Sequence, residues 1–180
     1  MKILFMLTGS IACYKSAAAI SKLMQSQCEV QTVATTSALQ FLGAATLEGL
    51  TGRPVFQSLF EDGRRMDHIH LARWADLLIV NPATANTVNE LGAGLGNNVV
   101  SSLVLTNNFL KPVWICPAMN AEMLKHPATQ NSLSLLKKWG ARILEGSDGN
   151  LACGEYGQGR LIEPDQLVTE VLSFRQRSSL

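Results

Sequence analysis

Residues 2–9 read KILFMLTG, a near-continuous apolar run that ends in a glycine. A short run of this kind is typical of a strand that is buried on both faces of a parallel sheet. The segments DLLIVNPAT (76–84) and KPVWICPAMN (111–120) repeat the pattern, and helical spacing follows the first run in ACYKSAAAISKLMQSQ (12–27). Strands that alternate with helices predict an α/β fold: one Rossmann-like (flavodoxin-like) domain over residues 1–180, with a parallel sheet and helices on both faces.

The remaining segments fit the same alternation. EVQTVATT (29–36) alternates between apolar and polar residues, which predicts a second strand. Elsewhere, apolar residues at helical spacing predict further helices, and proline or glycine predicts loops. We therefore expect one or two short helices in 37–52, a loop in 53–67, a helix, a loop and a helix in 85–106, a helix in 127–139, a short strand in 141–146 and a closing helix in 164–177.

The composition excludes several classes of protein. The formal net charge is +1, so neither nucleic acid nor an anionic membrane surface is an expected partner. No apolar segment is long enough to span a membrane, and the start of the chain is better explained as a strand than as a signal peptide. The four cysteines form no CxxC pair and the three histidines lack zinc spacing, which predicts a cytoplasmic protein without a metal site or disulfide scaffold. With 47% hydrophobic and 16% charged residues, the chain is expected to bury surface in an oligomer.

Small and polar residues follow the predicted strands where each one ends: TGSIA (8–12), ATTSA (34–38) and NPATANT (81–87). Parallel sheets of this type bind ligands at the carboxyl ends of their strands. Each hydroxyl could cap the following helix, or could hold an anion together with free backbone N–H groups. The first of these segments lacks the GxGxxG dinucleotide fingerprint, because Gly9 is its only glycine. The hydroxyl groups of the two segments TGSIA and ATTSA instead favour a mononucleotide. Pro82 lacks an N–H, which predicts that the chain leaves the sheet there.

Two histidines and one asparagine are candidates for chemistry. His68 and His70 lie in RRMDHIHLARWAD (64–76). If a helix starts here, Asp67 would be its N-cap, and His68 in the first turn would direct its ring toward the ligand-binding edge of the sheet. Two surface histidines on a solvated loop explain the pattern equally well. Asn120 follows a predicted strand, where it could bind a substrate or cap a helix.

Cys153 stands among four glycines in GNLACGEYGQGR (149–160). The glycines argue against a strand or a helix, and a cysteine in such a loop is unusual because free cysteine is normally buried. These residues indicate a reactive or a mobile cysteine without deciding between the two. Cys116, in a predicted buried strand, is most simply a core residue.

Six motifs occur along the chain in the order TGSIACYK, HIHLARWAD, NPATANT, GLGNNVVSS, PAMNAEM and ACGEYGQGR. Together they resemble the homo-oligomeric flavin-containing cysteine decarboxylases over about residues 2–175. Within that family the closest branch is that of the phosphopantothenoylcysteine decarboxylases. The resemblance implies a carbon–carbon lyase that uses FMN to convert the small molecule 4′-phosphopantothenoylcysteine to 4′-phosphopantetheine in coenzyme A biosynthesis. It also implies a homotrimer, or a dodecamer of trimers, with FMN at the subunit interface.

The resemblance also implies roles for residues at matching positions. His68 would be the catalytic acid/base, and Cys153 would be a catalytic proton donor on a substrate flap of about residues 145–162. The substrate-binding residues would be Asn120, Met119 and Ala152. Thr35 and Ser37, which follow the second predicted strand, would hold the phosphate of FMN. All the residues that would hold FMN follow predicted strands: Gly9, Ser10, Ile11, Thr35, Ser37, Thr84, Ala85, Asn86, Thr87 and Ala118.

The reaction explains why this family needs a flavin. Direct loss of CO₂ from a cysteine carboxylate would leave an unstabilised carbanion. In the family, a hydride passes from Cβ to the flavin and leaves a thioaldehyde, which accepts the electrons of the departing CO₂ and becomes an enethiolate. The hydride then returns, and Cys153 would protonate the enethiolate carbon.

Two alternatives stay open. A peptidyl-cysteine (lantibiotic-type) oxidative decarboxylase of the same family stops at the enethiol and would not need Cys153. A non-catalytic FMN-binding regulatory subunit would not need His68, Asn120 or Cys153. Asn150 departs from the family pattern, because some relatives carry an arginine at this position that can contact the substrate.

Overall fold

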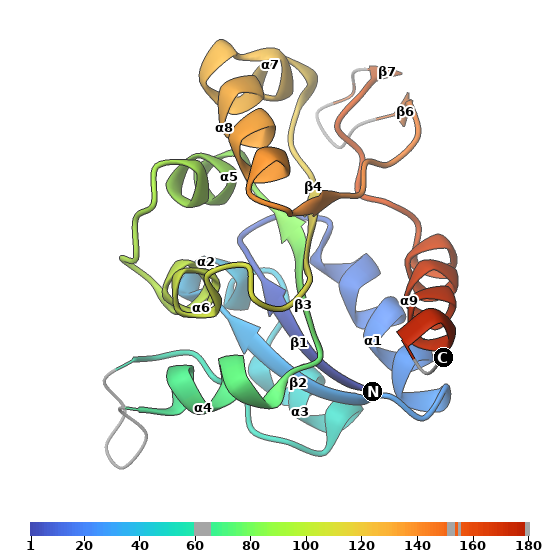
Figure 1. Cartoon of the computed structure of the whole chain (residues 1–180). Coiled ribbons are helices and arrows are strands. Elements are labelled where there is room, and N and C mark those ends of the chain that lie inside the picture. Colours follow the sequence, from blue (N-terminus) through green and yellow to red (C-terminus); the bar gives the residue numbers. More distant parts are fainter. Residues whose placement is uncertain (60–65, 151–153, 155, 179–180) are drawn as a thin grey trace.

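A computed structural model describes residues 1–59, 66–150, 154 and 156–178. Its centre is a five-stranded sheet in the order β2-β1-β3-β4-β5, in which all neighbouring strands are parallel (Figure 1). This is the order of flavodoxin-like folds, and its direction reverses between β1 and β3. The predicted α/β class is confirmed. The strands are β1 (Lys2–Leu7), β2 (Glu29–Ala34), β3 (Leu77–Ala83), β4 (Val113–Pro117) and β5 (Arg142–Ile143).

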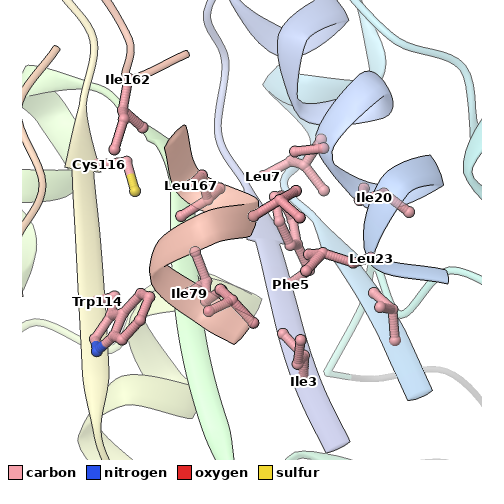
Figure 2. Packing of buried hydrophobic residues seen from close by; sticks show 14 of the residues in the cluster. Ile3, Phe5, Leu7, Ile20, Leu23, Ile79, Trp114, Cys116, Ile162 and Leu167 are labelled. Carbon is pink, nitrogen blue, oxygen red and sulfur yellow. The ribbon is translucent and has the colours of Figure 1, made fainter. Parts of the chain in front are cut away.

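Helices cover both faces of the sheet, as predicted. Side chains alternate along β1, so that Phe5 packs into one hydrophobic cluster and Met6 into the other. Figure 2 shows the first cluster, in which Phe5 lies close to Leu23 of the first helix. The helices on this face are α1 (Cys13–Gln25), α3 (Ala44–Thr51) and α9 (Pro164–Ser178). The opposite face carries α4 (Asp67–Trp74), α5 (Ala85–Gly92), α6 (Val99–Asn107) and α8 (Pro127–Lys138).

The short elements are where sequence and structure differ in detail. The sequence predicts one or two short helices in 37–52, and the structure has two, α2 (Thr36–Leu39) and α3. The helix α7 (Ala121–Lys125) and the antiparallel hairpin of β6 (Gly149–Asn150) and β7 (Tyr156–Gly157) have no counterpart in the sequence prediction. These three elements have five residues or fewer and contain no continuous apolar run, so the sequence offers no pattern by which to recognise them.

Two local predictions are wrong. β3 continues through Pro82 to Ala83, and its register with β4 shifts between Val80 and Ala83. An irregular register of this kind accommodates a residue without an N–H inside a central strand. In α4 the N-cap position is Met66, so Asp67 is the first helical residue and not the cap.

No helix in the described part of the chain is both long enough and apolar enough to cross a bilayer.

Candidate functional site

A pocket of about 600 Å³ opens at the carboxyl ends of β1, β2, β3 and β4. This is a volume typical of sites for small molecules and cofactors, and the pocket includes the edge where the strand order reverses. Every predicted cofactor position except Ile11 lines it. The lining residues are Thr8, Gly9, Ser10, Thr35, Thr36, Ser37, Thr84, Ala85, Asn86, Thr87, Asn98, Ala118, Met119 and Met123.

The tips of β1 and β2 approach closely at Gly9. A Cβ atom on Gly9 would lie 2.6 Å from the Cβ atom of Ser37, so this contact requires a glycine. Thr35 caps α2, because its Oγ1 accepts a hydrogen bond from the Ala38 N–H at 3.2 Å. The cap orders the start of α2, which holds Ser37 against Gly9. The Thr35 hydroxyl therefore acts as a helix cap and also lines the pocket.

The Ser10 hydroxyl does not cap α1. The N-cap position of that helix is Ala12, and Ser10 Oγ accepts a hydrogen bond from the Ala12 N–H at 3.2 Å. This bond uses the oxygen as an acceptor and leaves the hydroxyl hydrogen available to a ligand.

The tip of β3 is ordered by bonds to its own helix. Thr84 caps α5: its Oγ1 accepts from the Thr87 N–H at 3.3 Å and lies 3.1 Å from Thr87 Oγ1. Glu90 accepts amide hydrogens from Asn86 and Asn98, each at 2.8 Å. One carboxylate of α5 therefore orders two amides that line the pocket and that come from different elements.

The PAMN segment (117–120) connects β4 to the rest of the site. The Ala118 N–H donates to the Ala83 carbonyl at 2.9 Å, which joins the ends of β4 and β3. The Met119 N–H donates to the Gly159 carbonyl at 3.0 Å. The segment that follows the β6–β7 hairpin is thus attached directly to a pocket-lining residue.

Asn120 caps α7 through Oδ1, which accepts from the Met123 N–H at 2.8 Å. Its side chain is exposed next to Met119, which lines the pocket. Within the described ranges, Nδ2 of Asn120 makes no hydrogen bond, so both of its hydrogens can serve a ligand. The two roles weighed for this residue, helix cap and ligand donor, are compatible because they use different atoms.

Other predicted site residues lie apart from the pocket or outside the described residues. His68 is in the first turn of α4, as predicted, but it does not line the pocket. Figure 1 shows α4 at the opposite end of the view from α7 and the β6–β7 hairpin. Nδ1 of His68 is buried, and it has no hydrogen-bond partner among the residues that the structure describes. Ile11 is 58% exposed, and Ala152 and Cys153 lie outside the described residues.

Sequence reasoning missed several residues that line the pocket. Thr8 and Thr36 stand next to predicted residues, and their hydroxyls in TGSIA and ATTSA were the available signal. Asn98 caps α6 with a capping box and reaches the pocket from a separate helix. The only indication in the sequence that Asn98 contributes to the site was that it lies in GLGNNVVSS, one of the six motifs. Met123 enters with α7, which the sequence did not predict.

Three cysteines are described, and all of them are free and buried. Burial raises the pKa of Cys116 to about 12, and a hydrogen bond with Asn81 opposes this effect more weakly. Burial also raises the pKa of Cys13. Both thiols are therefore protonated at neutral pH and unsuited to act as nucleophiles. The interpretation of Cys116 as a core residue is confirmed by its position in the hydrophobic cluster shown in Figure 2.

Comparison with known proteins gives matches over nearly the whole chain. The model of the family described as Flavoprotein matches residues 1–176. The coenzyme A biosynthesis bifunctional protein CoaBC of Vibrio vulnificus is 40% identical over 181 residues, which cover 99% of this chain and 45% of that protein. The chain thus spans about half the length of the curated relatives it matches.

Two solved structures are similar in both fold and sequence. A cysteine-to-serine mutant of PPC decarboxylase, complexed with pantothenoylaminoethenethiol, has a TM-score of 0.85 and 30% identity, and the match covers 97% of this chain and 98% of the other. The FMN binding protein AtHal3 has a TM-score of 0.82 and 30% identity, with 98% and 97% covered. The chain therefore belongs to the Flavoprotein family.

Proposed function

We propose that this chain catalyses the FMN-dependent decarboxylation of 4′-phosphopantothenoylcysteine to 4′-phosphopantetheine, a step of coenzyme A biosynthesis, in the cytoplasm. The observation that carries the proposal is a pocket at the carboxyl ends of four parallel strands, with Asn120 beside it, in a chain 30% identical to a PPC decarboxylase over 97% of its length. The similarity to CoaBC supports the pathway, and the similarity to AtHal3 supports the cofactor.

The pocket residues fit FMN in size and chemistry. A volume of about 600 Å³ is sufficient for a ligand of this class. Gly9 exposes its backbone where a side chain would fill the space against Ser37. Hydroxyl groups gather at the tip of β2, where Thr35 and Ser37 would hold the phosphate. The tip of β3, from Thr84 to Thr87, and Ala118 would hold the rest of the cofactor.

Bound FMN would supply a two-electron acceptor that takes a hydride from the substrate and later returns it. The chain's own residues bind and orient the substrate. Asn120 would donate through Nδ2 to the carboxylate and amide end of the substrate, while the bond from the Met123 N–H to Oδ1 keeps the side chain in a fixed orientation. Met119 would contact the substrate from the same segment, with its backbone held by Gly159.

His68 would serve as the acid/base, and a second copy of the chain would bring it to the pocket. A homotrimer, or a dodecamer of trimers, with FMN at the subunit interface would achieve this. Two observations support the arrangement. His68 does not line the pocket of its own chain, and apolar side chains in or beside the pocket are exposed in a single chain: Met123, which lines it, is 48% exposed, and Ile11, which follows the pocket-lining Ser10, is 58% exposed.

Cys153 would protonate the enethiolate that remains after CO₂ leaves. Support comes from the similar PPC decarboxylase structure, because that cysteine-to-serine mutant holds an enethiol compound. We expect the variant Cys153→Ser to release CO₂ and to accumulate the oxidised enethiol in place of phosphopantetheine. Normal phosphopantetheine formation by Cys153→Ser would refute the role of Cys153 as proton donor.

The proposal is tested with purified protein and two substrates offered side by side. The protein should be yellow, bind FMN on titration, release CO₂ from phosphopantothenoylcysteine and yield phosphopantetheine by mass spectrometry. A peptide that ends in cysteine should stay unchanged in the same mixture. Conversion of the peptide alone would favour the peptidyl-cysteine decarboxylase, and FMN binding without conversion of either compound would favour a regulatory subunit. A protein that binds no FMN would contradict the proposal as a whole.

A further inference from the structure

Thr8 lies between the tips of β1 and β3, where the strand order reverses. Its side chain is buried, with 1% of the residue exposed. The Thr8 hydroxyl donates a hydrogen bond to the Pro82 carbonyl at 2.7 Å and accepts one from the Thr84 N–H at 3.1 Å. A single oxygen atom therefore joins two pocket-forming tips that are far apart in the sequence.

Both sides of this bridge continue directly into pocket residues. Thr8 precedes Gly9, whose backbone lies against Ser37 of the third tip. Thr84 is the N-cap of α5, and its Oγ1 already binds the Thr87 N–H. The backbone N–H and the hydroxyl of Thr84 are thus both engaged. The Thr8 hydroxyl therefore links Gly9 to the start of α5.

The start of α1 also connects the ends of β1 and β3. Cys13 Sγ donates to the Thr8 carbonyl at 3.3 Å, and burial keeps this thiol protonated as a donor by raising its pKa. One turn further along α1, Ser16 Oγ lies 3.0 Å from the Asn81 carbonyl and 2.7 Å from Asn81 Oδ1. α1 is therefore tied to the end of β1 and to the end of β3, and Thr8 is the member of this network that also lines the pocket.

We propose that Thr8 is a positioning residue for the flavin. Its hydroxyl holds the tip of β1 and the start of α5 at the separation that FMN requires, and it acts through Gly9 and Thr84. The inference rests on the proposed function, because it takes FMN as the occupant of the pocket. It assigns a role in the geometry of the pocket to a side chain that is not among the predicted cofactor-binding residues.

The test compares three variants of the full chain by two measurements, the Kd for FMN from flavin fluorescence and the melting temperature without FMN. Thr8→Val keeps the shape of the side chain but leaves the Thr84 N–H and the Pro82 carbonyl without their partner. Thr8→Ser keeps the hydroxyl. Thr51→Val is the matched control: Thr51 is 6% exposed, and its hydroxyl lies 2.9 Å from the Leu47 carbonyl and 3.3 Å from the Arg53 N–H, away from the pocket.

We expect Thr8→Val to raise the Kd for FMN by roughly tenfold, and Thr8→Ser to stay within about twofold of the wild type. Thr51→Val should lower the melting temperature and leave the Kd unchanged, because it removes a buried hydroxyl that has only a structural role. If Thr8→Val does not fold, Thr8→Cys replaces it. A thiol is a weaker donor and acceptor than a hydroxyl, so the Kd of Thr8→Cys for FMN should exceed that of Thr8→Ser.

The outcomes separate this inference from the proposed function. A wild-type chain that binds no FMN overturns both. FMN binding by the wild type, together with equal Kd values for the hydroxyl-bearing and hydroxyl-free variants at position 8, overturns only the role of Thr8. An equal loss of affinity in Thr51→Val and Thr8→Val also overturns it, since the effect would then reflect general stability.

Discussion

The strand tips and the start of α4 differ in whether their polar side chains find hydrogen-bond partners within a single chain. At the tips, Thr8, Thr35 and Thr84 each have hydrogen-bond partners that fix the loops around the pocket. On α4, Nδ1 of His68 is buried, has no partner among the described residues and does not line the pocket. One chain therefore builds the pocket at the strand tips but leaves the proposed acid/base outside it. FMN binding and chemistry should therefore be separable by mutation.

The largest effect is expected from His68→Asn, which removes the proposed acid/base. CO₂ release should fall by about 100-fold or more, in line with the usual contribution of general acid–base catalysis, while the Kd for FMN stays unchanged. His70→Asn is the control, because His70 is exposed on the same helix. Product formation and FMN titration are measured on all three proteins. An active His68→Asn enzyme would move the acid/base role to another residue.

The next effect should come from Gly9→Ala, which inserts a methyl group where the tips of β1 and β2 meet. The new Cβ atom would lie 2.6 Å from the Cβ of Ser37, so the tips must separate. Overpacking of this kind costs about 1–3 kcal/mol, and we expect the Kd for FMN to rise by about tenfold or more.

Gly49→Ala is the matched control for that substitution. Gly49 lies in α3, and a Cβ atom there meets nothing within 4 Å. This variant should gain about 0.5–1 kcal/mol of stability from higher helix propensity and bind FMN as the wild type does. Thermal melting and FMN titration distinguish the two glycines. Equal Kd values for the two variants would contradict the assignment of Gly9 to the pocket.

Cys116 is a buried thiol in the hydrophobic core, to which no catalytic role is assigned. Its pKa is raised to about 12 by burial, whereas an unfolded thiol ionises near pH 9. Below about pH 9 the Cys116 thiol is protonated in both the folded and the unfolded protein. Above about pH 9 it loses its proton in the unfolded protein only. The free energy of unfolding therefore falls by up to about 1.4 kcal/mol per pH unit until about pH 12. Cys116→Ser should remove this part of the decline, as measured by urea unfolding. Parallel pH profiles for the two proteins would disprove the contribution of Cys116.

The smallest effect is expected from Thr32→Val in β2. Thr32 is fully buried, and its Oγ1 has no hydrogen-bond partner within the described part of the chain. In contrast to Thr8, its replacement should leave stability unchanged or raise it by about 1 kcal/mol, because an unpaired hydroxyl is removed from the core. Chemical unfolding tests this, and the Kd for FMN should not change. A clear loss of stability would show that the Thr32 hydroxyl has a partner.

Much of the fold was predictable because the strands are continuous apolar runs. KILFMLTG (2–9) could only be buried on both sides, and the helical spacing that follows it required a crossover to a parallel neighbour. The pocket was predictable for the same reason: once the strands are parallel, TGSIA, ATTSA and NPATANT must meet at one edge. Local pattern and topology agree in this part of the molecule.

The remaining features depend on contacts that no local pattern records. Asn98 reaches the pocket because Glu90 and the start of α6 hold it there, and Thr8 is recognisable as a bridge only when β1 and β3 are neighbours. Pro82 stays in its strand because the register with β4 shifts nearby. The sequence signals that a helix begins near His68, but the packing of that helix decides that the histidine lies away from the pocket of its own chain.

Complementation between two inactive chains tests most directly whether a second copy of the chain brings His68 to the pocket. His68→Asn, with an intact pocket, and Gly9→Val, with an intact His68, are coexpressed with different tags, and mixed oligomers are purified through both. If the pocket and His68 of one site come from neighbouring chains, each mixed trimer contains one complete site, and activity should return to about a third of the wild-type value. Mixed oligomers as inactive as either parent would contradict the claim that a second copy of the chain completes the site.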